Sequence, residues 1–100
     1  MRSRFSAFAV GDDGYLLRTW HATTRPRRIA FDPEQLWSHL EILDTTGGSL
    51  FDSDGTVEFR AHHSRHGRAG AQHEKSRFVR DDGRWVYLDG IALGVRQHRP

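Results

Sequence analysis

Residues 73–90, HEKSRFVRDDGRWVYLDG, say more about the fold than any other stretch of the chain. They predict two strands joined by a tight turn at residues 81–83, because Asp and Gly accept the positive φ angles that hairpin turns require. Side chains alternate along a strand, so Glu74, Ser76 and Phe78 share one face. If Phe78 faces the core, a carboxylate faces it too and needs hydrogen-bond partners or a chemical role. The hairpin therefore predicts a pocket with Glu74 in its wall.

The composition predicts one small domain. The chain has 100 residues, enough for a modest core, and we expect a single domain over residues 1–91 with a C-terminal tail over residues 92–100. It has no cysteine, which excludes disulfides and cysteine-ligated zinc or iron–sulfur sites. No apolar run approaches the ~20 residues of a membrane span, and the N-terminus is too mixed for a signal peptide. We expect a cytoplasmic protein without membrane association.

The charge pattern does not favour a nucleic-acid partner. The formal net charge is only +2, and the basic residues, almost all of them Arg, are interleaved with acids along the whole chain. The most basic segment, RAHHSRHGR at residues 60–68, has no aromatic side chain on which a base could stack. A nucleic-acid-associated accessory domain therefore stays only as an alternative.

Helices are predicted at the N-terminus. Residues 1–10 form an amphipathic stripe that Gly11 should end at the position after the helix. Asp12 or Asp13 should cap a second helix over residues 14–20. These two helices would pack their aromatic and aliphatic side chains on one face of a sheet.

The rest of the chain predicts mainly strands. Asp32 followed by Pro33 first predicts a third, short helix that carries Leu36 and Trp37 inward. Alternation and turn signals then predict strands over residues 39–45, 56–64, 71–80 and 84–89. The fold class is therefore α+β, with N-terminal helices on one face of a strongly bent antiparallel sheet.

The outer face of the expected sheet is mostly charged. Its predicted residues are Glu58, Arg60, His62, Lys75, Arg77 and Val79. Obligate interfaces are more apolar than this face. We therefore expect a monomer or a weak homodimer.

Several motifs resemble one protein family. The segments are MRSRFSAF, YLLRTWHATTRP, GTVEF, HEKSRF and GRWVYLDG. In this order and spacing they resemble the central domain of the YchJ-like family of uncharacterised bacterial proteins, over residues 1 to about 91. The resemblance implies a nuclear-transport-factor-2-like fold, in which helices and a strongly bent antiparallel sheet form a cone. It implies no particular activity, because the family has no agreed one.

The chain also departs from that family. Members usually carry a short cysteine-rich SEC-C zinc motif before the domain, after it, or both, and this sequence has neither. Met1 falls inside the family's usual first helix. We therefore expect either an internal boundary or a late start at Met1, with a longer natural protein upstream.

Glu74 with Ser76 is the best candidate for chemistry. Related cone-shaped folds place an Asp, Glu or His base in an apolar cavity, so the resemblance implies that Glu74 could act as such a base. The favoured alternative is a structural ion pair between Glu74 and Arg4 or another helix arginine.

Two histidines are further catalytic candidates. His63 is predicted to face the core near Ala61, and His21 follows Trp20 at a helix end. Space-filling or capping roles are the simpler interpretation for both. His62, His66 and His73 lie on a strand and in loops, without the i, i+4 spacing of a helical metal site. We expect no metal and no cofactor.

The predicted pocket combines aromatic and polar side chains. Its residues are Arg4, Trp20, His21, Phe59, Glu74, Ser76, Phe78, Trp85 and Tyr87. We expect Phe78 and Trp85 to be largely buried. The favoured function is a module that binds a small ligand or another protein, and the alternative is a small cofactor-free lyase, isomerase or hydrolase that uses Glu74.

Overall fold

The computed structural model describes residues 1–97, and the end of the expected tail, residues 98–100, lies outside the described part. The elements in chain order are α1 (Arg2–Val10), α2 (Asp13–Arg18), β1 (Gln35–Gly47), β2 (Asp54–Arg65), β3 (Arg68–Asp81) and β4 (Arg84–Gln97). The strands form one antiparallel sheet in the order β1-β2-β3-β4. The α+β class is therefore confirmed.

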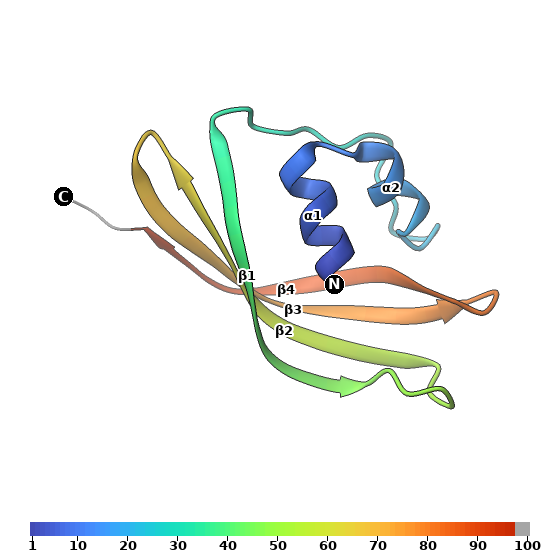
Figure 1. Cartoon of the computed structure of the whole chain (residues 1–100). Coiled ribbons are helices and arrows are strands. Elements are labelled where there is room, and N and C mark those ends of the chain that lie inside the picture. Colours follow the sequence, from blue (N-terminus) through green and yellow to red (C-terminus); the bar gives the residue numbers. More distant parts are fainter. Residues whose placement is uncertain (98–100) are drawn as a thin grey trace.

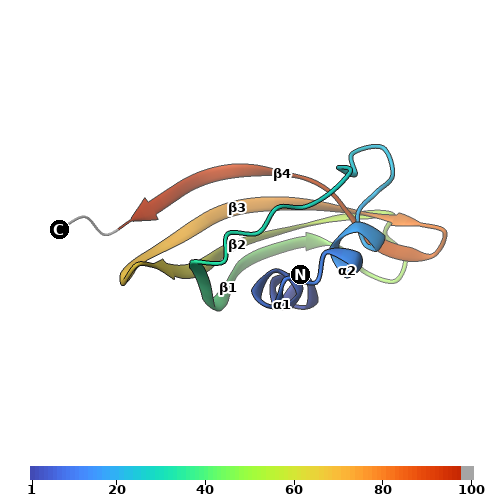
Figure 2. The same ribbon diagram turned by 90° about the horizontal axis from the view of Figure 1, so that it is seen from above.

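The sheet is bent and open. Figures 1 and 2 show the four strands curving together, with α1 and α2 on the same, concave face. The pairing of β1 with β2 and of β3 with β4 shifts register at two points each, and such irregularities increase bend and twist. Within residues 1–97, β1 and β4 are both edge strands and do not pair with each other, so the sheet does not close into a barrel.

The two helix boundaries follow local chemistry. Gly11 ends α1 in the left-handed conformation, with φ 72°, which glycine adopts without steric cost. Asp12 then accepts a hydrogen bond from the Tyr15 backbone N–H at 3.0 Å and so caps α2. Both predicted signals are confirmed, although α2 ends at Arg18, two residues before the expected end.

The predicted third helix is wrong. Asp32 accepts a hydrogen bond from the Glu34 backbone N–H and forms an ion pair with Arg65. It therefore caps a turn rather than a helix. The chain enters β1 directly, and pairing with β2 takes over the residues expected to be helical. Strand alternation then directs only one of the two expected inward residues to the helices: Trp37 packs on α1, whereas Leu36 is 65% exposed.

The last strand is longer than predicted. The sequence predicts a strand that ends at Asp89 and a tail from residue 92, whereas β4 continues to Gln97 and so includes residues 92–97. Its second half pairs with the first half of β3, as far as Gly70 opposite Gln97. The alternation of Ile91, Leu93 and Val95 is a local strand signal for this extension that the prediction did not use, and pairing with β3 completes the strand.

The core lies between the helices and the concave face. Its buried apolar residues are Ala7, Leu16, Phe59 and Ala61, whereas Ala71 and Val86 are buried on the opposite side of their strands. Leu16 of α2 is completely buried, and Phe5 of α1 meets Trp37 of β1 edge-on, with ring centroids 6.0 Å apart. α2 is only six residues long, too short to be stable alone, so its packing through Leu16 holds it in place.

The opposite, outer face carries cross-strand ion pairs. They are Arg60–Glu41 (3.6 Å), His62–Glu41 (3.1 Å), His73–Glu58 (2.7 Å) and Arg77–Asp89 (2.6 Å). The charged character expected of this face is therefore seen in the structure.

His63 of β2 is a buried histidine on the concave face. Its side chain is 8% exposed, and its ring meets the Trp37 ring edge-on at 5.3 Å. Its buried Nδ1 has no hydrogen-bond partner among the described residues. Burial, and secondarily the charge of neighbouring His62, lower the pKa of His63, so the folded state favours the neutral ring.

We expect Leu16→Ala to lower the free energy of unfolding by about 2–5 kcal/mol, because it empties a fully buried site. The matched control is Leu50→Ala, at a position that is 78% exposed, and it should change the free energy by less than about 0.5 kcal/mol. Urea unfolding of both variants measures the difference. Equal effects of the two substitutions would contradict the role assigned to Leu16.

We expect His63 to make the fold less stable in mild acid. The unfolded histidine binds a proton near its ordinary pKa of about 6.5, whereas the folded one resists protonation to a lower pH. Stability should therefore fall as the pH drops below about 6.5 and should be unaffected by this group above it. His63→Phe should lose less stability than the parent between pH 7.5 and 5.5 in urea unfolding. Parallel losses in the two proteins would show that His63 does not contribute.

Candidate functional site

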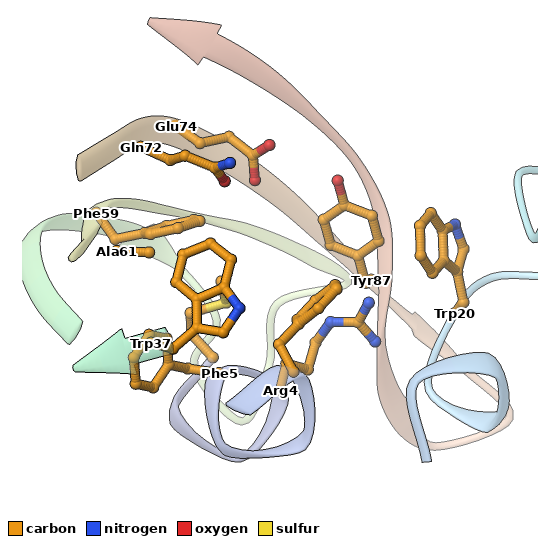
Figure 3. A pocket seen from close by; sticks show the side chains of 11 residues that line it. Arg4, Phe5, Trp20, Trp37, Phe59, Ala61, Gln72, Glu74 and Tyr87 are labelled. Carbon is orange, nitrogen blue, oxygen red and sulfur yellow. The ribbon is translucent and has the colours of Figure 1, made fainter. Parts of the chain in front are cut away.

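A cavity lies between α1 and the concave face of the sheet, with a volume of about 240 Å³. Its lining residues are Met1, Arg4, Phe5, Phe8, Trp20, Trp37, Phe59, Ala61, Gln72, Glu74 and Tyr87. They come from α1 and the segments next to the helices on one side and from all four strands on the other, and Figure 3 shows how the labelled side chains lie. The wall is thus mainly aromatic, with a few polar groups among the rings.

The structure brings part of the predicted pocket together. Arg4, Trp20, Phe59, Glu74 and Tyr87 all line this cavity. Ser76 does not reach its surface, because it is fully buried beside Glu74. The five lining residues come from distant parts of the chain, and only the bend of the sheet and the position of α1 bring them together.

The other predicted pocket residues lie elsewhere. Phe78 and Trp85 line a separate groove of about 440 Å³ near the β1–β2 turn, and both are only partly buried, contrary to expectation. Trp85 shares the face of Tyr87 on β4 but lies nearer the β3–β4 turn, where the Arg80 guanidinium carbon is 4.8 Å from its ring centroid. His21 sits in a turn, with its Nδ1 2.7 Å from the Thr23 hydroxyl. His63 lines a polar cleft near the β2–β3 turn, so neither histidine joins Glu74.

Glu74 is held in the wall by its neighbours on three strands. It lies on β3 opposite Phe59 of β2 and accepts a hydrogen bond from the Ser76 hydroxyl, 2.7 Å from Oε2. On the β4 side its carboxylate lies over Gly90, where a Cβ atom would come within 2.7 Å of Glu74 Cδ and within 2.9 Å of both oxygens. A glycine at this position therefore leaves the space that the carboxylate occupies.

Arg4 does not form the expected ion pair with Glu74. No carboxylate of the described residues lies within 4 Å of its guanidinium. Instead, Nη1 donates to the Leu16 carbonyl (3.3 Å), the Thr19 carbonyl (3.2 Å) and the Thr19 hydroxyl (2.6 Å). Arg4 is 4% exposed, and burial lowers its pKa from the usual range. It is a structural cation that joins α1 to the end of α2.

Tyr87 stands between Arg4 and Glu74. Its ring lies 4.6 Å from the Arg4 guanidinium carbon and meets the Trp20 ring edge-on at 4.8 Å. Burial, followed by the negative charge of Glu74, raises the pKa of Tyr87 to about 12. The hydroxyl therefore stays protonated at neutral pH and can donate a hydrogen bond. Figure 3 shows this hydroxyl on the same side of the cavity as the Glu74 carboxylate.

Several lining residues escaped the sequence analysis. Phe5 and Phe8 belong to the predicted apolar stripe of the first helix, but nothing in the sequence showed that the stripe faces a cavity. The predicted third helix carries Trp37 inward, but it is strand β1 that places this ring in the cavity wall. Gln72 could have been found, because it shares the alternating face of Glu74 on β3.

No metal centre is evident in the described residues. His62, His66 and His73 contact three different carboxylates, those of Glu41, Glu34 and Glu58. Within residues 1–97, no group of three His, Asp or Glu side chains is placed to hold a metal ion. Neither of the helices in this range is long and apolar enough to cross a bilayer.

Several bacterial proteins have sequences similar to this chain. A UPF0225 protein of Streptomyces coelicolor is 58% identical over 93 residues, which cover 93% of this chain and 72% of the relative. One from Streptomyces avermitilis is 57% identical over 90 residues, covering 90% and 61%. One from Chromobacterium violaceum is 46% identical over 95 residues, covering 92% and 70%. The chain thus spans about two thirds of the length of these relatives.

No solved structure gives a significant match to this chain. The family profile described as "YchJ, middle NTF2-like domain" matches residues 1–90, which include both helices, the first three strands and every lining residue of the cavity. The resemblance seen in the sequence is therefore confirmed, and the chain belongs to the YchJ-like family of UPF0225 proteins and corresponds to its middle NTF2-like domain.

Proposed function

We propose that this domain binds a small organic ligand in the cavity between α1 and the sheet. The observation that carries the proposal is the position of Glu74, a carboxylate in an otherwise largely aromatic wall. Apolar cavities with a few convergent polar groups are the usual form of small-molecule sites. We also infer that the bent sheet and its helices act as the wall of a cone whose interior is this cavity.

The size of the cavity limits the ligand. Its volume of about 240 Å³ is below the ~300–1,000 Å³ typical of sites for drug-sized molecules. A single ring with a short polar substituent fits this volume better than an extended cofactor. The rings of Phe5, Trp37 and Phe59 offer aromatic faces and edges to such a body.

Filling the cavity tests the proposal. Ala61 is buried in the cavity wall, so Ala61→Leu should occupy ligand space. We expect single-ring fragments to shift the NMR signals of Phe5, Trp37 and Tyr87 in the parent, and we expect Ala61→Leu to abolish these shifts. The matched control is Ala69→Leu, the same substitution at an exposed position of the β2–β3 hairpin, which should bind like the parent. Fragments that bind Ala61→Leu as well as the parent would refute the cavity as the binding site.

A second candidate function is proton abstraction from a carbon acid. The supporting observation is that the Glu74 carboxylate and the protonated Tyr87 hydroxyl both face the cavity. Glu74 would take a proton from the carbon next to a carbonyl, and the electron pair would move onto the carbonyl oxygen. Tyr87 would donate a hydrogen bond to that oxygen as its charge develops. Return of the proton to another carbon would complete an isomerisation.

A generic carbon acid tests this chemistry. Nitrobenzisoxazole opens when a base removes its C–H proton; the electron pair forms a nitrile, and the N–O bond breaks to give a coloured phenolate. We expect the parent to accelerate this reaction above buffer by about 10²-fold or more, as expected for a positioned base. Glu74→Gln should remove the acceleration, whereas Glu41→Gln, on the outer face, should not. Equal rates for the parent and Glu74→Gln would exclude Glu74 as a base.

A further inference from the structure

Glu74 supplies the one carboxylate among the residues that line the cavity, and the described residues leave it without a close partner of opposite charge. No Lys, Arg or His nitrogen of the described residues lies within 4 Å of it. Its one hydrogen bond within the described chain comes from the Ser76 hydroxyl to Oε2. A carboxylate can accept about four hydrogen bonds, so most of its acceptor capacity is unused.

The position of this carboxylate is built into the sheet. The absence of a side chain at Gly90 leaves room for it, since an added Cβ would lie 2.7 Å from Cδ. Ser76, which is fully buried, fixes one oxygen from the other side. The carboxylate is thus held at the cavity wall, where a ligand can meet it without rearrangement.

The nearby cation does not provide an equivalent site for an anion. Arg4 already donates three hydrogen bonds through Nη1 to oxygens of Leu16 and Thr19. Its guanidinium carbon also lies 4.6 Å from the Tyr87 ring and 5.3 Å from the Trp20 ring, so aromatic faces cover it. With only 4% of the residue exposed, Arg4 offers little surface to a carboxylate or a phosphate.

We infer that the ligand of this cavity is a small organic cation whose N–H donors bind the Glu74 carboxylate, while its apolar part packs on the surrounding rings. The inference rests on the proposed ligand cavity and names its ligand class. Charge-assisted hydrogen bonds are about twice as strong as neutral ones, and aromatic faces attract cations as well as apolar groups. Amidinium, guanidinium and primary ammonium compounds on a single ring or a short chain have this chemistry.

Three probes of similar shape test the ligand class: benzamidine, which is cationic, benzamide, which is neutral, and benzoate, which is anionic. We expect benzamidine to bind the parent at least about tenfold more tightly than benzamide, the ratio that corresponds to one charge-assisted hydrogen bond. Benzoate should bind more weakly than benzamide. Calorimetry and NMR titration measure the three dissociation constants.

Two variants assign the preference to Glu74. Glu74→Gln keeps the shape of the side chain but removes its charge. It should weaken the binding of benzamidine about tenfold and change the dissociation constant of benzamide by no more than about twofold. Gly90→Ala keeps the charge but displaces the carboxylate, so it should also reduce the preference for benzamidine. Because one variant changes the anchor and the other only its neighbour, a folding defect in one leaves the other informative.

The outcomes separate this inference from the proposed function. If benzamide or benzoate binds as tightly as benzamidine, and Ala61→Leu abolishes binding, the cation preference is wrong while the ligand cavity stands. If the parent prefers benzamidine to benzamide and both Glu74→Gln and Gly90→Ala keep the same preference, Glu74 is not the group that binds the cation. If no probe binds, the inference falls together with the cavity.

Discussion

The buried guanidinium of Arg4 holds the helical layer against the sheet. It connects α1 to the end of α2 through three hydrogen bonds to Leu16 and Thr19, and it lies against the rings of Trp20 and Tyr87. The Thr19 carbonyl accepts a hydrogen bond from the Tyr87 backbone N–H, which ties the same point to β4. A buried charge is costly unless it is hydrogen-bonded. The position of α1, and with it one wall of the cavity, depends on this arrangement.

This arrangement also determines the electrostatics of the cavity. Because carbonyl oxygens and aromatic rings surround Arg4, the cation needs no carboxylate partner close by. Glu74 therefore remains available, and it still contributes at longer range to the field around Arg4 and Tyr87. Had the two groups formed the expected ion pair, the Glu74 carboxylate would not be free to bind a ligand. The separation of the two charges is what makes this space a candidate site.

The sequence could predict the parts of the fold that local chemistry determines. Gly11 and Asp12 fix the helix ends through backbone conformation and capping, and the Asp-Asp-Gly turn at 81–83 fixes the β3–β4 hairpin. Alternation on β3 correctly placed Glu74 on the concave face. The strand that carries Trp37 was not predicted, because pairing with β2 overrides the local helix signal. The second half of β4 has an alternating pattern at Ile91, Leu93 and Val95, but its full length depends on pairing with β3. The distance between Arg4 and Glu74 depends on tertiary packing, which no spacing in the sequence encodes.

The site explains why a glycine, Gly90, stands at the end of the segment GRWVYLDG. Its φ angle is not positive, so Gly90 is not needed for backbone conformation, and its role is better explained by the space above its Cα. That space holds the carboxylate of Glu74 on the neighbouring strand β3, between buried Ser76 and the cavity. A larger residue on β4 would press the carboxylate away from its hydroxyl donor. The hairpin thus keeps a charged group in an aromatic wall by leaving out one side chain and burying one hydroxyl, so the same eighteen-residue stretch that fixes the fold also positions the site.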